Sequence, residues 1–204
     1  NKMDRMGANF GHCVTGIRER LGANVLLHHV PLGSHDEFVG MCDLIENVAY
    51  IWKEEGKDSP WETIPLDQVK SRFNFATSRD NDWIDELPKL RQDALETALA
   101  LDDDAFMAFV ETGEFDPAML KACIRKGTVT GQLVPVFCGS SFKNKGVQQL
   151  LDAVIAYMPY PGENGGISMV DPDGNIIGTQ EVSDDAPARA LAFKVINDQF
   201  RTLT

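Results

Sequence analysis

The hydrophobic and polar positions between Val134 and Met158 follow two different periodicities. An apolar run of strand length ends at Gly139, and helical spacing then begins. The apolar positions of the helical part are Val147, Leu150, Leu151, Val154, Ile155 and Met158. The polar loop 139–146 therefore lies between a predicted buried strand and a predicted helix. Ligands bind at the carboxyl ends of strands in open α/β sheets, so this loop is a candidate binding site.

The first quarter of the chain has the pattern of one helix followed by several strands. Phe10 to Leu21 has helical spacing and ends just before Gly22, a typical helix stop. The apolar segments that follow predict strands of a small antiparallel sheet, namely Val25–Val30, Phe38–Ile45 and Val48–Trp52. His28 and His29 would alternate along the first of these strands and point to opposite faces, which predicts that they do not share a metal. The loop triple His35 to Glu37 is expected to be solvated.

The middle of the chain is predominantly helical in pattern. Predicted helices cover Leu66–Phe75, Trp83–Val110 and Pro117–Lys126, and Pro88 is expected to break the second one. On the stretch from Leu90 to Asp104, spacing of about 100° per residue gathers acids on one side and apolar residues on the other. The acids are Asp93, Glu96, Asp103 and Asp104, and the apolar residues are Leu90, Ala94, Leu95, Ala98 and Leu101. A solvated face opposite a core face is one interpretation.

A Pro/Gly linker at Met158 to Gly162 marks the clearest domain boundary. Beyond it, Ile167–Val170 and Asn175–Gly178 flank a turn at Asp173 and Gly174, which predicts a hairpin. The alternating stretch Ala190–Ile196 predicts a further strand.

Composition narrows the possible partners. The formal net charge is −12, and we expect no basic patch for nucleic-acid phosphates, so the acidity favours solubility or a basic protein partner. No apolar stretch approaches the ~20 residues needed to cross a bilayer, and the start at Asn1 is unlike an export leader. The cysteines have no Cys-x-x-Cys spacing and are expected to be reduced, buried and inert; they are Cys13, Cys42, Cys123 and Cys138.

The first residues, Asn-Lys-Met-Asp, together with the later Gly-Ser-Ser loop resemble the guanine-reading half of a GTPase domain. A carboxylate such as that of Asp4 can accept hydrogen bonds from the ring N–H and the exocyclic amine of guanine, whereas adenine would leave it unpaired. In this resemblance Asn1 approaches the imidazole edge of the base and the Lys2 stem lies along the ring. The backbone N–H of Ser141 donates to guanine O6, and Ser140 braces the loop.

The stretch from Gly139 to Gln148 resembles, almost residue for residue, the corresponding loop of bacterial and organellar elongation factor G. Asn1 to Arg5 is similar to the first motif of that family. Further matches are Arg20, Leu21, Gly22, Ala23, Asn24, Gly40, Asp43, Leu44, Ile45 and Trp52, so the resemblance covers nearly the whole chain. The implied nucleotide-binding residues are Asn1, Lys2, Asp4, Ser140, Ser141 and Phe142. The family more often has alanine at the position of Ser141, and either residue provides the backbone N–H that is expected to donate to guanine O6.

The resemblance implies an α/β fold: the C-terminal half of a P-loop GTPase domain with an inserted α+β subdomain, followed by the start of a β-barrel domain. The implied parts are 1–24 (GTPase domain, guanine-specificity loop and helix), 25–131 (inserted subdomain), 132–160 (GTPase domain, second guanine loop and last helix) and 161–204 (linker and first part of the barrel). The sequence has no Gly-x-x-x-x-Gly-Lys-Ser/Thr phosphate loop. Catalytic residues and Mg²⁺ ligands are therefore expected outside this stretch, which should not hydrolyse GTP alone. The segment 74–85 is longer than is usual in the family.

The resemblance also implies a cytoplasmic GTPase that binds GTP and GDP and drives tRNA–mRNA translocation on the ribosome. Contacts with tRNA and mRNA would come only from the rest of the intact protein, and no membrane is involved. In the family, the acidic helix contacts the stalk protein of the large ribosomal subunit, which here would involve Asp93, Glu96 and Asp103, although Ala100 replaces a usual acid. Alternatives are a ribosome-recycling paralogue, a release or ribosome-protection factor and, in another class, a non-enzymatic partner-binding module. The sequence leaves translocase and recycling paralogue undistinguished.

Overall fold

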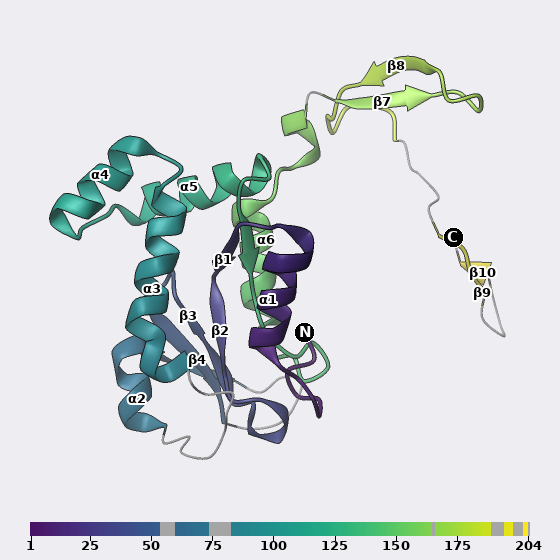
Figure 1. Ribbon diagram of the computed structural model, residues 1–204. Coiled ribbons are helices and arrows are strands. Elements are labelled where there is room, and N and C mark those ends of the chain that lie inside the picture. Colours follow the sequence, from purple (N-terminus) through teal and green to yellow (C-terminus); the bar gives the residue numbers. More distant parts are fainter. Residues whose placement is uncertain (54–59, 74–82, 165, 189–193, 198–201, 204) are drawn as a thin grey trace. The chain divides into compact units, whose positions relative to one another are not determined.

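The computed structural model describes residues 1–53, 60–73, 83–164, 166–188, 194–197 and 202–203 of the chain (Figure 1). They belong to two compact units, Asn1–Met158 and Pro159–Thr204. The predicted longer segment 74–85 falls mostly on residues outside this description.

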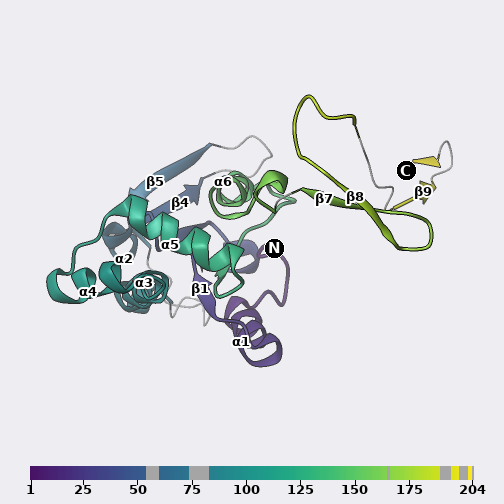
Figure 2. The same ribbon diagram turned by 90° about the horizontal axis from the view of Figure 1, so that it is seen from above.

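A short parallel sheet carries the loop singled out by the sequence. Strand β1 (Val25–Leu27) pairs with β6 (Val134–Val136), with Val25 opposite Val134. Helices α1 (Phe10–Leu21) and α6 (Val147–Tyr157) lie on opposite sides of β1 (Figure 2). The prediction of a fully buried strand is wrong for β6, because Val134 is 40% exposed.

Helix α1 has the predicted bounds, and hydrogen bonding and backbone conformation at its two ends explain them. The Asn9 side chain accepts a hydrogen bond from the backbone N–H of His12 at 2.7 Å, which caps the N-terminus. Gly22 ends the helix in the left-handed conformation, with φ of 62°. Helix α6 likewise begins at the predicted Val147.

A separate antiparallel sheet follows the order β2-β3-β4-β5. Its strands are β2 (His29–Leu32), β3 (Gly40–Asp43), β4 (Val48–Trp52) and β5 (Trp61–Pro65), and the 3₁₀ turn η1 (His35–Glu37) joins the first two. The predicted single strand Val25–Val30 is therefore wrong. Its first half pairs with β6, whereas its second half pairs with β3, and the change of sheet occurs at His28. This break also removes the alternation that was expected to separate His28 from His29.

Helical elements follow the antiparallel sheet in the chain, and α3 (Trp83–Leu99) contacts its strand β2. They are η2 (Leu66–Gln68), α2 (Val69–Arg72), α3 (Trp83–Leu99), α4 (Asp103–Thr112) and α5 (Pro117–Val129). Pro88 lies inside α3 and does not break it, because the flanking Ile84 and Leu87 are buried and stabilise the turn that holds it. The interruption comes later, where Asp102 caps α4 by accepting from the N–H of Ala105. The predicted continuous helix from Leu90 to Asp104 is wrong for this reason.

One hydrophobic core joins both sheets to the helices. Leu26 of β1, Leu44 after β3, Leu99 of α3 and Ile124 of α5 are all fully buried within it. Three cysteines are buried, as predicted, but Cys13 is exposed on α1. Among the described helices, none is long and apolar enough to cross a bilayer.

The second unit begins with the 3₁₀ turn η4 (Pro161–Asn164). Strands β7 (Ile167–Val170) and β8 (Ile176–Gln180) form the predicted hairpin, whose turn is stabilised by Asp171 accepting from the N–H groups of Asp173 and Asn175. The short strands β9 (Ile196–Asn197) and β10 (Thr202–Leu203) pair with each other. Most of the predicted strand Ala190–Ile196 lies outside the described residues, and those that are described form no barrel.

Candidate functional site

The two motifs far apart in the sequence meet at the end of β6. The N–H of Met3 donates to the carbonyl of Gly139 at 3.2 Å. The loop itself closes through a pair of backbone hydrogen bonds of 2.9 Å between Ser140 and Lys145. Figure 1 shows the N-terminus beside this loop, ahead of α6. The fold thus brings together the polar groups that the sequence selected separately.

Asp4 is held by the serine that was expected to brace the loop. The Ser140 hydroxyl donates to Asp4 Oδ1 at 2.6 Å, and Ser140 is fully buried. This hydrogen bond, opposed by burial, holds the pKa of Asp4 below its usual value. Asp4 is therefore a carboxylate at neutral pH, the state that accepts hydrogen bonds from two donors at once.

The Asn1 side chain accepts a hydrogen bond from the backbone N–H of Ser141, the group that the resemblance assigns to guanine O6. Its Oδ1 accepts from the backbone N–H of Ser141 at 3.0 Å and from the Ser141 hydroxyl at 3.1 Å. In this structure the backbone N–H expected to meet guanine O6 therefore donates to Asn1. Rotation of the Asn1 side chain would free this N–H for an external carbonyl. Lys2 beside it is exposed and has a left-handed backbone, with φ of 66°.

Two further residues, Lys145 and His35, support the motifs in roles that the sequence did not predict. Lys145 is 6% exposed, and its Nζ donates to the carbonyl of Phe38 at 2.9 Å. The N–H of His35 donates to the carbonyl of Met3 at 2.8 Å, and its half-buried ring accepts from the N–H of Gly7 at 3.1 Å. The expectation of a solvated triple is thus wrong for His35 and confirmed for Asp36 and Glu37, which are exposed. These contacts tie the segment after β2 to the two motifs. The local sequence, a lysine before the glycine that starts a helix, hardly indicates that Lys145 is buried. Its partner, the carbonyl of Phe38, is distant in the sequence and becomes a neighbour only in the fold.

The remaining predicted residue of this set, Phe142, is 74% exposed. A cavity of about 420 Å³ borders the first motif and is lined by Asn1, Lys2, Phe10 and Val136 among others. Asp4, Ser140, Ser141 and Phe142 do not line it. The Asp4 carboxylate and the loop residues 140–142 therefore lie outside the lining of this cavity.

The acids predicted to bind a partner lie on two helices. Asp93 and Glu96 are exposed on α3, and Asp103 is exposed in the first turn of α4. Glu96 accepts a hydrogen bond from the Gln92 side chain at 2.7 Å. Within the part of the chain that the structure describes, none of these acids forms an ion pair.

The chain is similar to known proteins over most of its length. Residues 1–160 match the family described as "Elongation factor Tu GTP binding domain". The whole chain is 41% identical to "Elongation factor G 2" of Vibrio cholerae and 39% identical to "Elongation factor G" of Gluconobacter oxydans. It spans 28% of the length of each of these relatives.

A solved structure from Thermus thermophilus has a similar fold, with a TM-score of 0.58 over 78% of this chain and 21% of that one. At 22% sequence identity, this likeness concerns the fold alone.

Proposed function

Because this chain belongs to the family of the elongation factor Tu GTP-binding domain, in its elongation factor G branch, we propose that its two motifs form the guanine pocket of a translational GTPase. The pocket comprises Asn1, Lys2, Asp4, Ser140, Ser141 and Phe142. The observation that supports it most directly is the 2.6 Å hydrogen bond from Ser140 to Asp4, which links two motifs that the sequence alone selected.

The chemistry of the pocket accounts for base selectivity. The Asp4 carboxylate accepts from the N1–H and the 2-amino group of guanine, while Ser140 keeps it ionised and oriented. The Ser141 N–H donates to O6 once Asn1 turns toward the imidazole edge. Adenine offers no donor pair at these positions, so a buried charge would be left unsatisfied.

In the intact protein, the pocket would serve GTP hydrolysis on the ribosome that drives tRNA–mRNA translocation. GTP and GDP would be the ligands, while the phosphate-binding residues, the Mg²⁺ ligands and the catalytic residues lie outside this stretch. The stretch alone should therefore bind no phosphate productively and hydrolyse no GTP. A ribosome-recycling paralogue would use the same pocket. The cytoplasm is the compartment of such a factor.

We further propose that Asp93, Glu96 and Asp103 contact the stalk protein of the large ribosomal subunit. Their exposure, and their lack of ion pairs among the described residues, support an external basic partner.

The test of the guanine pocket is Asp4→Asn in the full-length protein. The amide donates to the 2-oxo group of xanthine but repels the 2-amino group of guanine, so GTP affinity should fall about 10- to 100-fold and xanthosine triphosphate should bind better. Equilibrium titration with both fluorescent nucleotides measures the two affinities. The matched control, Asp67→Asn, changes the same group at an exposed site on η2 and should alter neither. Unchanged GTP binding with no gain for the xanthine nucleotide would refute the pocket.

A further inference from the structure

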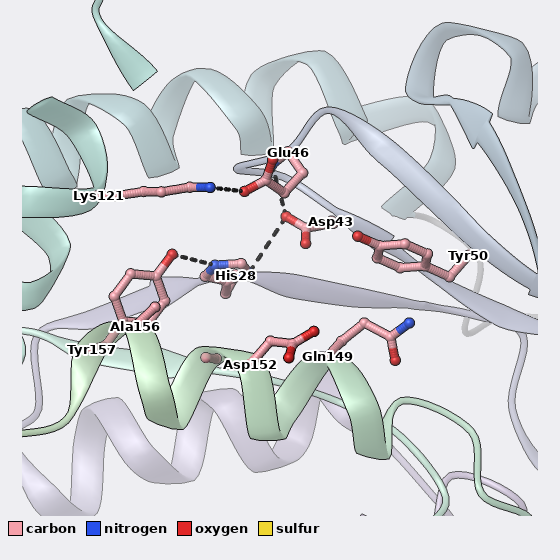
Figure 3. A pocket seen from close by; sticks show the side chains of 10 residues that line it. His28, Asp43, Glu46, Tyr50, Lys121, Gln149, Asp152, Ala156 and Tyr157 are labelled. Atoms are coloured by element: carbon pink, nitrogen blue, oxygen red, sulfur yellow. Dashed lines mark hydrogen bonds and ion pairs between the residues drawn. The ribbon is translucent and has the colours of Figure 1, made fainter. Parts of the chain in front are cut away.

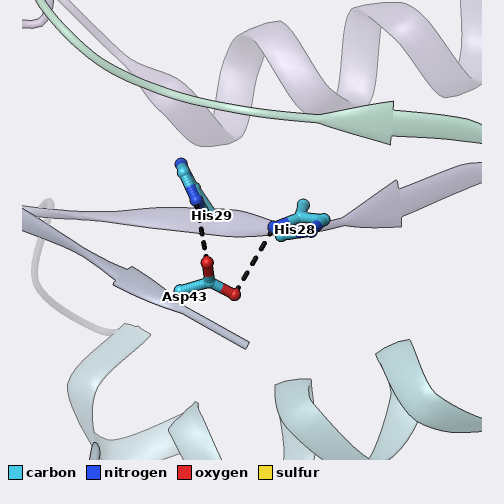
Figure 4. Close-up of side chains that lie close together, drawn as sticks. All are labelled: His28, His29 and Asp43. Carbon is cyan, nitrogen blue, oxygen red and sulfur yellow. Dashed lines mark hydrogen bonds and ion pairs between the residues drawn. The ribbon is translucent and has the colours of Figure 1, made fainter. Parts of the chain in front are cut away.

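A buried cluster of two histidines and one aspartate lies where the two sheets meet, apart from the proposed guanine pocket. His28 Nδ1 is 3.4 Å from Asp43 Oδ1, and His29 Nε2 is 3.2 Å from Asp43 Oδ2 (Figure 4). The three residues are 4%, 1% and 3% exposed, respectively. One ligand atom from each lies within 4.8 Å of the others.

The strand break explains why neighbouring histidines converge. The N–H of His28 donates to the carbonyl of Val136 at the end of β6, and the carbonyl of His28 accepts from the N–H of Leu44 after β3. His29 begins β2 directly opposite Asp43. The backbone therefore turns between the sheets at these residues, and both imidazoles reach the same carboxylate.

Hydrogen bonding leaves part of this cluster unsatisfied. His28 Nδ1 is buried and has no hydrogen-bond partner, although it faces the carboxylate. Buried polar atoms are nearly always paired in proteins, so an unpaired nitrogen aimed at a carboxylate needs a physical account. Asp43 Oδ1 is already occupied by the N–H groups of Ile45 and Glu46, at 3.0 and 2.9 Å. A cation between the imidazoles and the carboxylate would use the lone pair of His28 Nδ1.

The donor set and its spacing suit zinc. Zn²⁺ binds imidazole nitrogen and carboxylate oxygen at about 2.0–2.2 Å in tetrahedral sites, which separates neighbouring ligand atoms by ~3.3 Å. His28 Nδ1 lies 3.4 Å from Asp43 Oδ1, and His29 Nε2 is hydrogen-bonded to the other carboxylate oxygen, Oδ2, at 3.2 Å. Both distances are close to this edge, and all three ligand atoms lie within 4.8 Å of one another. Mg²⁺ and Ca²⁺ prefer sites made of oxygen atoms alone.

The surroundings provide orientation and access. His28 Nε2 lies 3.1 Å from the Tyr157 hydroxyl of α6, a contact that fixes the ring as outer partners do in zinc sites. His28 and Asp43 also form part of the wall of a cavity of about 270 Å³, which Glu46, Tyr50 and Asp152 help to line (Figure 3). The cavity gives an ion a route to the cluster and leaves room for water.

We propose that His28 Nδ1, His29 Nε2 and the Asp43 carboxylate bind one Zn²⁺, with a water molecule from the cavity as the fourth ligand. The ion joins the end of β1 to the antiparallel sheet. It thereby stiffens the connection between the parallel pair that carries the guanine loop and the segment inserted after it. This role is structural and does not depend on the proposed guanine pocket.

The experiment measures Zn²⁺ in the full-length protein after chelator treatment and dialysis against Zn²⁺, without nucleotide and with excess Mg²⁺. We expect His29→Gln and Asp43→Asn to lose about one equivalent of Zn²⁺ relative to the wild-type protein. The matched control is His12→Gln, which removes an exposed histidine of α1 and should retain the ion. Co²⁺ used as a probe should give the visible absorption of a tetrahedral site only where Zn²⁺ binds.

A measurement on the wild-type protein covers the case in which the cluster variants fail to fold. Zn²⁺ should raise its thermal midpoint, and a chelator should reverse the rise. A wild-type protein that binds no stoichiometric Zn²⁺, or a folded His29→Gln protein that binds as much, would overturn the proposal. Either result would leave the three residues as a hydrogen-bonded network alone, with the guanine pocket unaffected.

Discussion

Ser140 sets both the charge and the position of the carboxylate proposed to read the base. Its hydroxyl donates to Asp4 Oδ1 and accepts weakly from the N–H of Lys143 at 3.4 Å. A carboxylate whose pKa is lowered in the folded state stabilises that state above pH 3.8, and this stabilisation is lost as the pH falls through the lower folded value. The hydroxyl therefore extends the pH range over which Asp4 stays ionised.

Ser140→Ala should accordingly weaken GTP binding several-fold at neutral pH and move the acid limb of binding to higher pH, since the pKa of Asp4 rises. Nucleotide titrations of the full-length protein between neutral and acid pH would measure both effects. Ser141→Ala is the comparison, because it keeps the backbone N–H and should cause a smaller loss with no shift of the acid limb. An acid limb that moves equally in both variants would contradict this role of Ser140.

At the scale of single residues, the sequence selected Asp4 and Ser140 as site residues but did not predict the hydrogen bond between them or the residues that support them. A carboxylate at Asp4 and a hydroxyl at Ser140 are groups whose chemistry is known from the residue type, so a sequence motif is enough to identify them as candidates. Lys145 and His28 depend on partners that are distant in the sequence, namely the carbonyl of Phe38 and the carboxylate of Asp43. Nothing in the local pattern identifies such partners.

At the scale of elements, two glycines within helices differ in the space around them: Gly16 has room for a side chain and Gly127 has none. A Cβ on Gly16 of α1 would meet nothing within 4 Å, whereas a Cβ on Gly127 of α5 would lie 2.4 Å from Leu101 Cδ1 and 2.8 Å from Leu133 Cβ. Gly127 thus allows α5 to pack closely against Leu101, which follows α3, and against Leu133, which precedes β6.

Replacing each of these two glycines by alanine should change the stability of the protein in opposite directions. Gly16→Ala should raise the free energy of unfolding by about 0.5–1 kcal/mol, because alanine has the higher helix propensity. Gly127→Ala should lower it by about 1–3 kcal/mol through overpacking. Denaturant unfolding of both variants provides the measurement. Equal effects of the two substitutions would show that α5 does not pack as described.

Local signals predicted the elements whose boundaries are local. Helix α1 has its Asn9 cap and its Gly22 stop in the sequence, and the hairpin has its Asp171 turn. The strand prediction for Val25–Val30 failed because sheet membership depends on pairing with β6 and β3. The helix prediction across Asp102 failed although a signal was present, since an aspartate at that position is a strong N-cap residue.

At the scale of the whole molecule, the net charge of −12 creates a field that acts on any approaching partner. Asp93 and Glu96 on α3 and Asp103 on α4 contribute to it, and in the described parts of the chain none of the three forms an ion pair. Complementary charge mainly accelerates encounter, and salt screens it over roughly 8 Å at physiological ionic strength. A docking role for this face should therefore be visible in the association rate and in its salt dependence.

Charge reversal on this face tests that role. In the full-length protein, Glu96→Lys with Asp103→Lys should slow association with ribosomes by about 3- to 10-fold at low salt, and the difference should shrink as salt is added. GTP affinity should not change, because neither side chain lines the proposed guanine pocket. The matched control is Asp184→Lys with Asp185→Lys, which alters the net charge equally at exposed positions of the second unit. Stopped-flow association measured over a salt series separates the two pairs: equal slowing would assign the effect to total charge, and no slowing by the first pair would make α3 and α4 an ordinary solvated surface.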